Sequence, residues 1–235
     1  MKINLVMPMG GAGTRFSKEG YECPKPLIDL KGKPFFYWAA MSVIKKIDVE
    51  KMIFVILQDH ADRFDLDKKI LEYFPEAVIH YLPKVLNGAV YTCLEGAKYI
   101  DNDKPVIFCD CDLKFESTAL NEFYAGDSID ADGSLVTFNS DRDRYSYVKK
   151  NDEGYVIETA EKKVISNEAI CGAYGFRSAG LFIGNSEEYV KDCPYNECFM
   201  SGVYNVMIKK GLKVRSFMVD DIVSFGTPEE LNAIK

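Results

Sequence analysis

The first half of the chain alternates short apolar runs with segments of helical spacing. Apolar runs bounded by glycine, proline or charge are typical of strands buried on both faces of a parallel sheet. Such runs predict strands over Ile3–Met7, Lys51–Leu57, Ala77–Leu82 and Pro105–Cys109. Between them the spacing predicts helices over Pro34–Ile47, His60–Phe74 and Ala89–Ile100. The alternation indicates an α/β fold, with a mostly parallel sheet covered by helices on both faces.

The second half has a different pattern, in which short strands follow one another. Polar turns separate predicted strands over Gly133–Phe138, Tyr145–Lys149, Tyr155–Ala160, Ile170–Phe176, Leu181–Ile183 and Leu212–Phe217. A helix is predicted over Met200–Lys210, and Gly211 is suited to end it. The sequence has no linker or repeat between the halves. We therefore expect one domain over residues 1–235, with a half of about 1–130 and a small β-rich subdomain of about 131–235.

A glycine-rich loop directly follows the first predicted strand. Residues 10–16 read Gly-Gly-Ala-Gly-Thr-Arg-Phe, and Lys25 lies between Pro24 and Pro26. Glycine lets backbone N–H groups approach an anion closely, and successive N–H groups form an anion-binding concavity. Arg15 and Lys25 add positive charge to this loop. These residues predict a binding loop for a nucleoside triphosphate; the alternative is a strand-to-helix turn without a ligand.

The loop differs from the two more common phosphate-binding motifs. A Walker A motif requires Lys-Ser or Lys-Thr after its glycines, and neither follows Gly13. The dinucleotide fingerprint requires a third glycine three residues after the second, where this chain has Phe16.

The loop and several later segments resemble one family, the sugar-phosphate nucleotidyltransferases, also called sugar-nucleotide pyrophosphorylases. Residues 10–16 are similar to its signature, as are Pro-Lys-Pro-Leu-Ile at 24–28 and Gly-Lys-Pro at 32–34. Other blocks of the family resemble 87–89 (Asn-Gly-Ala), 106–112 (ending Asp-Cys-Asp), 161–174 (Glu-Lys-Lys, Ser-Asn and Gly-Ala-Tyr) and 226–231 (Gly-Thr-Pro-Glu-Glu-Leu). The resemblance covers nearly the whole chain. It implies a Rossmann-like fold whose first half binds the nucleotide and whose second half binds the acceptor.

The resemblance also implies a reaction and its residues. A phosphate oxygen of the acceptor attacks the α-phosphorus of the nucleotide and expels pyrophosphate, which needs positioning, charge neutralisation and Mg²⁺. The expected catalytic residues are Arg15, Lys25 and Lys162. The expected nucleotide-binding residues are Gly10, Gly11, Gly13, Thr14, Arg15, Lys25, Gln58, Asn87 and Gly88, the last leaving a slot open for the base. The expected acceptor-binding residues are Glu161, Lys162, Asn167 and Gly172.

The metal site departs from the family pattern. Asp112 is the expected ligand of Mg²⁺, but Ser224 stands where the family often has a second metal-binding aspartate. Residues two apart on a strand share a face, so Asp110 is our candidate for the second ligand. Asp220 and Asp221 are its rivals.

Composition narrows the function classes. Hydrophobic residues make up 47% and charged residues 28%, as in ordinary globular enzymes. The net charge of −7 argues against nucleic acid or an anionic membrane as partner. Because no apolar run fits a membrane span or a signal peptide, we expect a cytoplasmic protein. The seven cysteines are scattered, which predicts reduced thiols and no zinc site.

The sequence is compatible with three functions. The leading one joins a nucleoside triphosphate, with the pyrimidines CTP, UTP and dTTP favoured, to a phosphorylated sugar or similar small phosphorylated acceptor for surface polysaccharide synthesis. The second is a metal-dependent glycosyltransferase of related fold, because residues 110–112 form an Asp-x-Asp motif. The third is a non-catalytic nucleotide-binding protein. The sequence is also compatible with assembly into a homo-oligomer.

Overall fold

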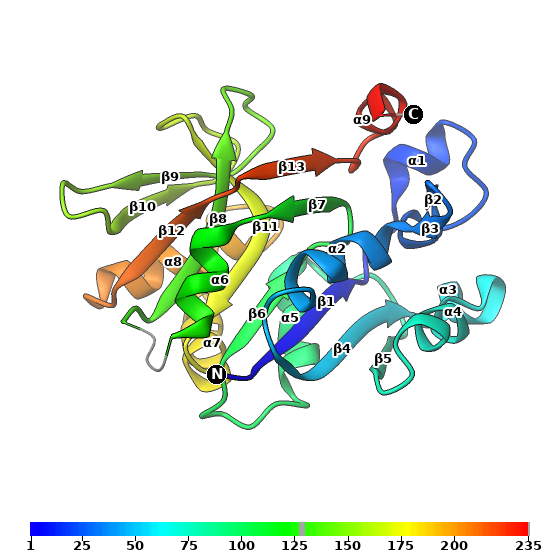
Figure 1. The fold of residues 1–235 in the computed structure, drawn as a ribbon, viewed down its shortest axis with the longest axis horizontal. Helices are drawn as coiled ribbons and strands as arrows, with labels where there is room; N and C mark the ends of the chain where they lie inside the picture. Colours follow the sequence, from blue (N-terminus) through cyan, green and yellow to red (C-terminus); the bar gives the residue numbers. More distant parts are fainter. Residues whose placement is uncertain (127–129, 235) are drawn as a thin grey trace.

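The computed structural model describes residues 1–126 and 130–234, and within them a large mixed sheet forms the centre of the fold (Figure 1). Its parallel strands are β1 (Ile3–Met9), β4 (Val49–Leu57), β5 (Val78–Leu82) and β6 (Val106–Cys109). The later strands are β8 (Gly133–Asn139), β9 (Tyr147–Lys150), β10 (Val156–Ala160), β11 (Glu168–Phe176) and β12 (Val214–Met218). The spatial order is β10-β9-β11-β6-β1-β4-β5, with β8 beside β11 and β12 beside β8. Antiparallel pairing of β11 with β6 makes the sheet continuous through both halves of the chain.

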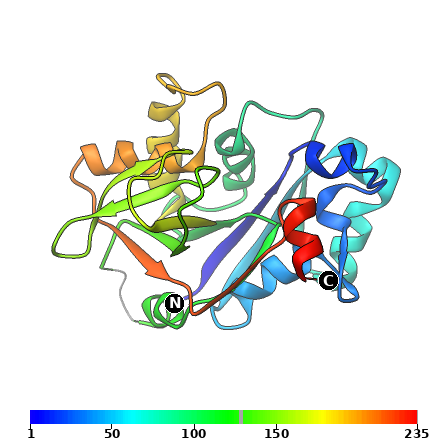
Figure 2. The ribbon, with the colours of Figure 1, turned by 90° about the horizontal axis from the view of Figure 1, so that it is seen from above.

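The central strand β1 sends alternate side chains into two apolar clusters. Val6 packs with α5 (Ala89–Ala97) on one face of the sheet, and Leu5 packs with α2 (Phe35–Ile44) on the other. Gly96 allows the close approach of α5, because a Cβ at this position would lie 2.5 Å from Cγ1 of Val6. Helices therefore lie on both faces of the parallel strands (Figure 2), which confirms the predicted α/β fold.

The second half continues this two-faced packing. Helices α7 (Ala179–Tyr189) and α8 (Met200–Lys209) join the cluster that contains α5. Helix α6 (Thr118–Ala125) packs on the opposite face, through Leu120 and Tyr124. Most predicted strands and helices are present with small shifts of their ends.

Two predictions about secondary structure were wrong. Leu181–Ile183, expected as a strand, lies inside α7, because the Ser178 hydroxyl caps a helix there by accepting from the N–H of Leu181. The helix expected over His60–Phe74 is divided into α3 (Gln58–Phe64) and α4 (Leu66–Tyr73). Asp65 separates them with a left-handed φ of 52°.

The glycine loop and the C-terminal segment lie side by side. The loop leads into α1 (Thr14–Lys18), followed by a 3-10 turn η1 (Lys25–Leu27) and the short strands β2 (Asp29–Leu30) and β3 (Lys33–Pro34). A separate ribbon pairs β7 (Leu113–Glu116) with β13 (Asp221–Ser224) and leads to α9 (Pro228–Ile234). Phe16 and Phe35 from the start of the chain share an apolar cluster with Phe225 and Leu231 from its end. This cluster fixes α9 against α1 (Figure 1).

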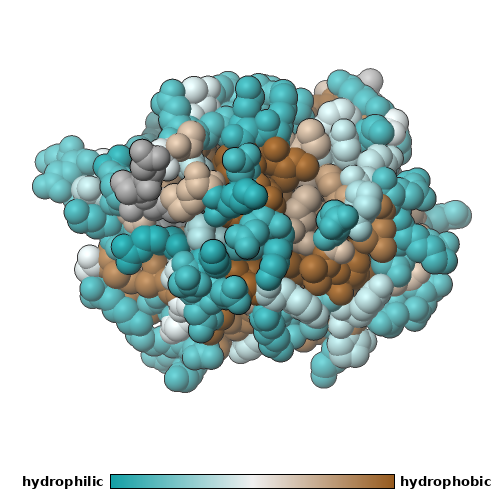
Figure 3. Space-filling view, turned by 60° about the horizontal axis from the view of Figure 1, so that its bottom comes forward, coloured by the Kyte–Doolittle hydropathy of each residue, from teal (hydrophilic) through white to brown (hydrophobic). Residues whose placement is uncertain are grey.

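Several expectations from composition concern the surface and the thiols. Figure 3 shows one face of the molecule, where hydrophilic residues cover most of the surface and smaller hydrophobic areas lie between them. Within residues 1–126 and 130–234, every helix falls short of the length and apolar character that a membrane span requires. The cysteines are free thiols, and all except Cys23 and Cys193 are buried.

Candidate functional site

A cavity between the two halves of the chain brings together one predicted catalytic residue, both predicted metal ligands and two predicted acceptor-binding residues, whereas Lys25 lines a second pocket with Gly13. Arg15 reaches it from α1, and Asp110 and Asp112 reach it from the bend between β6 and β7. Glu161 and Gly172 line it from the second half of the chain. The cavity therefore lies beyond the carboxyl ends of β1 and β6, where ligands bind in open α/β sheets.

Two glycines make room for the two aspartates. A Cβ at position 172 would lie 2.7 Å from Oδ2 of Asp110, and a Cβ at position 226 would lie 2.7 Å from Oδ2 of Asp112. Gly172 also has a left-handed φ of 85°, and its carbonyl accepts from the N–H of Asp110 at 2.8 Å. Gly172, predicted to bind the acceptor, thus bonds the backbone of Asp110 and leaves room for its carboxylate while it lines the cavity.

Asp112 interacts with two charged neighbours, Lys25 and Asp110. The ammonium of Lys25 lies 2.7 Å from Oδ2 of Asp112. Burial lowers the pKa of Lys25, but the facing carboxylates of Asp112 and Asp110 raise it by more, so the net pKa is above its usual value. Burial, and then the charge of Asp112, raise the pKa of Asp110 to about 7 against the opposing effect of Lys25. Burial is thus the main cause of the raised pKa of Asp110, and the neighbouring carboxylate of Asp112 adds to it.

The glycine loop combines one left-handed glycine with one exposed glycine. Gly13 adopts a left-handed φ of 62° and precedes α1, which Thr14 begins. Gly11 is exposed, with open space around its Cα, whereas Gly10 packs against Leu82 and Thr92. Gly11 and Thr14 are thus open to a ligand, and the glycine at position 10 is required by packing.

The turn predicted to contact the base packs against the protein itself. Gly88 has a φ of 110°, and a Cβ there would collide with the backbone of Cys198. The carbonyl of Asn87 accepts from the N–H of Cys198 at 3.1 Å. The space beside Gly88 is thus filled by backbone, and the expectation of an open slot for the base was wrong. Gln58 lies apart on the exposed start of α3, where its amide donates to Asp62 at 2.8 Å.

On the acceptor side, Glu161 is the predicted residue best placed for substrate contact. Its Oε2 accepts from the hydroxyl of Ser201 at 2.9 Å and from the hydroxyl of Ser146. Lys162 and Asn167 are exposed and are not among the residues that line the cavity. The ammonium of Lys162 lies 4.6 Å from the centre of the Phe199 ring.

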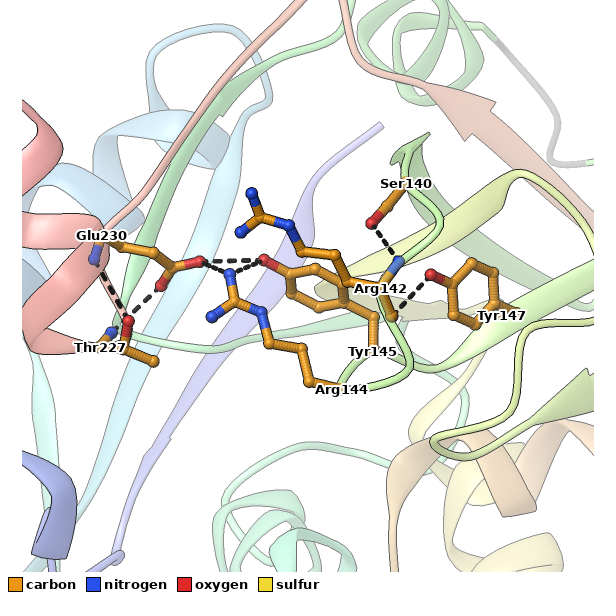
Figure 4. A network of polar contacts seen from close by, with 7 residues as sticks. All are labelled: Ser140, Arg142, Arg144, Tyr145, Tyr147, Thr227 and Glu230. Atoms are coloured by element: carbon orange, nitrogen blue, oxygen red, sulfur yellow. Dashed lines mark hydrogen bonds and ion pairs between the residues drawn. The ribbon is translucent and has the colours of Figure 1, made fainter.

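A polar network at the cavity was missed by sequence reasoning (Figure 4). Arg144 forms an ion pair with Glu230 of α9 and donates to the Tyr145 hydroxyl at 2.6 Å. The Tyr145 hydroxyl donates to Glu230 at 2.9 Å. All three line the cavity, although 85 residues separate Tyr145 from Glu230. The charged run 141–144 gave no sign of this partner, since such runs are also typical of solvated turns.

The rival metal ligands lie away from the cavity. Asp220 accepts from the N–H of Thr118 at 2.6 Å at the start of α6, which lowers the pKa of Asp220. Asp221 is exposed and pairs with Glu116 across the β7–β13 ribbon, whereas Ser224 at the other end of β13 lines the cavity.

The carboxylates that line the cavity could hold a divalent cation only together with ligands from substrate or water. The described residues contain no group of three or more His, Cys, Asp or Glu side chains that could hold a metal ion. Mg²⁺ in phosphoryl-transfer sites is often held by one or two carboxylates, with phosphate oxygens and water completing its octahedron. The pair of Asp110 and Asp112, which lines the cavity, suits that arrangement.

The comparisons with known proteins agree with this geometry. A family model described as nucleotidyl transferase matches residues 4–232. A curated relative, the D-glycero-alpha-D-manno-heptose 1-phosphate guanylyltransferase of Campylobacter jejuni, is 24% identical over 236 residues, covering 97% of this chain and 96% of the relative.

Solved structures share the fold over almost the full chain. A nucleoside-diphosphate-sugar pyrophosphorylase from Vibrio cholerae has a TM-score of 0.84 at 22% identity and covers 98% of each chain. An inositol-1-phosphate CTP transferase from T. maritima has a TM-score of 0.79 at 18% identity, covering 99% of this chain and 92% of that chain. These likenesses confirm the predicted Rossmann-like architecture.

Proposed function

The chain belongs to the nucleotidyl transferase family, and from this premise we propose that it transfers the nucleotidyl group of a nucleoside triphosphate to a sugar phosphate, with release of pyrophosphate. The observation that carries the proposal is the convergence of Arg15, Asp112 and Glu161 on one cavity. Arg15 comes from the glycine loop, Asp112 from the bend after β6, and Glu161 from the second half of the chain. A sugar phosphate as acceptor is further supported by the names of the relatives described above.

The chemistry requires no nucleophile from the protein. An oxygen of the acceptor phosphate forms a bond to the α-phosphorus, while the bond from that phosphorus to the β-phosphate oxygen breaks. Pyrophosphate leaves with the electron pair of the broken bond. The protein therefore has to align the two substrates and stabilise negative charge that moves onto pyrophosphate.

Three groups divide this work in our proposal. Arg15 lies exposed at the start of α1, where it can bind the β- and γ-phosphates. Lys25 reaches them from the opposite side of the glycine loop once it parts from Asp112. Glu161 hydrogen-bonds acceptor hydroxyls, held in place by Ser146 and Ser201.

The cofactor in this proposal is Mg²⁺, held by Asp112 and Asp110. When bound, the ion neutralises charge on the triphosphate and fixes its geometry. The support is the pair of carboxylates that lines the cavity, since oxygen ligands of this kind are the ones Mg²⁺ prefers. Lys162 stays a candidate for the acceptor side, which requires its ammonium to leave the ring of Phe199.

The base is the part of the proposal that the structure changes most. The preference for CTP, UTP or dTTP depended on an open slot at Gly88, and the backbone of Cys198 fills that space. The names of the relatives include a guanylyl and a cytidylyl donor. The proposal therefore covers purine and pyrimidine triphosphates. We further propose that the product is an activated sugar for surface polysaccharide synthesis in the cytoplasm.

A pyrophosphate-release screen tests the proposal. The enzyme is mixed with Mg²⁺, each of ATP, GTP, CTP, UTP and dTTP, and a panel of sugar 1-phosphates and other phosphorylated alcohols. The expected result is pyrophosphate release with at least one pair of triphosphate and acceptor. The Asp112→Asn variant should show no such release. Transfer of sugar from a nucleotide sugar, without pyrophosphate release from any pair, would instead support the glycosyltransferase.

A further inference from the structure

The acceptor side of the cavity needs a cation to receive a phosphate, and the structure offers one that sequence reasoning did not find. The expected cation, Lys162, is exposed and lies against the Phe199 ring instead of lining the cavity. Among the described residues that line the cavity, the positively charged side chains are Arg15 and Arg144. Arg15 belongs to the glycine loop. Arg144 is therefore the cation that the second half of the chain brings to the cavity.

Among the described residues, the hydrogen bonds of the Arg144 guanidinium involve a single nitrogen. Its Nη2 forms the ion pair with Glu230 and donates to the Tyr145 hydroxyl, and its Cζ lies 4.8 Å from the centre of the Tyr145 ring. Its Nε is buried and has no hydrogen-bond partner in the part of the chain that the structure describes. An unpaired buried donor is destabilising, so the guanidinium gains free energy by turning toward an anion. The side chain is 31% exposed, which leaves a route from the cavity.

The group that holds Arg144 is itself fixed. Oε2 of Glu230 accepts from the N–H of Thr227 at 3.1 Å, and the hydroxyl of Thr227 accepts from the N–H of Glu230 at 3.2 Å. These reciprocal bonds form a capping box at the start of α9, and Leu231 packs that helix against Phe16. Glu230 therefore holds Arg144 from a capped helix that packs against Phe16 of α1 (Figure 4).

We propose that Arg144 binds the phosphate group of the acceptor and that Glu230 positions it; this inference rests on the proposed function. A guanidinium donates two parallel hydrogen bonds to a phosphate, which fixes orientation as well as charge. Two residues after Arg144, Ser146 donates to Glu161. The turn that contains Arg144 and Ser146 thus supplies the guanidinium that binds the acceptor phosphate. It also orients Glu161, which binds the acceptor hydroxyls.

The kinetic test uses the best substrate pair of the pyrophosphate-release screen. Arg144→Ala should raise the acceptor KM by about 10- to 100-fold, the usual size for a lost hydrogen bond to a charged group, with the KM for the triphosphate unchanged. Glu230→Gln should raise the acceptor KM less and leave kcat intact, and Arg144→Lys should restore part of the loss. Arg142→Ala is the matched control, since Arg142 lies on the same turn and is exposed outside the cavity lining.

A binding test separates this inference from the proposed function. The probe is inorganic phosphate, titrated by calorimetry into Arg15→Ala, into Arg15→Ala with Arg144→Lys, and into Arg15→Ala with Arg142→Ala. The first and third should bind phosphate equally, and the second should bind it at least 10-fold more weakly. Equal binding by all three overturns the role of Arg144, whether or not the screen finds turnover. Loss of thermal stability without a change in phosphate binding would show that Arg144 only fastens its turn to α9.

Discussion

The ammonium of Lys25 lies 2.7 Å from a carboxylate oxygen of Asp112, joining the glycine loop to the bend after β6. The two side chains are 27% and 24% exposed, so the ion pair is only partly screened by water. In the proposed function these are the groups that receive the triphosphate and the metal. Substrate binding must therefore break this ion pair, so that Lys25 can contact the triphosphate and Asp112 can contact the metal.

The first prediction concerns the two cations of the glycine loop. Arg15→Ala and Lys25→Ala should each lower kcat/KM by roughly 10²–10⁴-fold, because both remove charge that stabilises the departing pyrophosphate. Steady-state pyrophosphate release measures the effect. Near-normal turnover by either variant would contradict the assignment of the loop to the phosphates.

The same two variants should differ in stability. Removing Lys25 leaves the half-buried carboxylate of Asp112 without its partner, which destabilises the folded state. Arg15 is exposed and forms no ion pair with a described residue, so its loss should leave the unfolding midpoint nearly unchanged. Thermal unfolding of both variants in metal-free buffer checks this difference, and equal midpoints would show that the ion pair contributes little.

The second prediction concerns Mg²⁺. Asp112→Asn should nearly abolish Mg²⁺-dependent turnover, and Asp110→Asn should raise the Mg²⁺ concentration for half-maximal rate, with partial rescue at high Mg²⁺ or by Mn²⁺. The matched control is Asp220→Asn, because Asp220 caps α6 outside the cavity. The control should keep the wild-type Mg²⁺ curve. An unchanged curve for Asp110→Asn would remove Asp110 from the metal site.

The third prediction concerns the glycine that makes room for Asp110. Gly172→Ala and Gly211→Ala both force alanine into a left-handed backbone, at a cost of roughly 1–2 kcal/mol of folding free energy each. Only position 172 also brings a methyl group against Asp110, since the space around Gly211 is open. Denaturant unfolding should show a larger loss for Gly172→Ala. Only this variant should also need more Mg²⁺ for turnover.

Much of this arrangement could be predicted from the sequence, and the physical reason is local. The apolar run Ile3–Met7 identifies a strand, and the loop after it predicts a phosphate-binding turn, without reference to the rest of the chain. The alternation of strands and helices then places Asp110 and Asp112 at the same edge of the sheet as the glycine loop. Asp110, Asp112 and Arg15 lie together in the structure as this reasoning requires.

What could not be predicted depends on contacts between distant parts of the chain. Glycine at position 88 is required by the backbone of Cys198, whereas a local interpretation assigned its missing side chain to a slot for the base. The role of Arg144 depends on Glu230, which α9 brings across the cavity. Likewise, the apolar run Leu181–Ile183 suits a strand as well as a helix. The hydroxyl of Ser178 caps a helix at this point, and the run is helical in the structure.

The fourth prediction separates acceptor binding from nucleotide binding. Glu161→Gln should raise the acceptor KM by about 10-fold or more, since the carboxylate is a stronger acceptor of hydroxyl hydrogen bonds than an amide. Calorimetric titration of the triphosphate should give the wild-type affinity. Ser201→Ala is a graded control, because it removes one of the two hydroxyls that orient Glu161. A large loss of triphosphate affinity in Glu161→Gln would place this residue on the nucleotide side.

The most direct test of the central claim is the stoichiometry of one reaction. The substrate pair that releases pyrophosphate is incubated with wild-type enzyme and Mg²⁺, and ³¹P NMR follows the triphosphate, the acceptor phosphate, pyrophosphate and the diphosphate-linked product. We predict that pyrophosphate and the diphosphate-linked product appear in equal amounts, and only when both substrates are present. Pyrophosphate or phosphate released without acceptor, or triphosphate bound without product for every acceptor, would contradict a nucleotidyl transfer at this cavity.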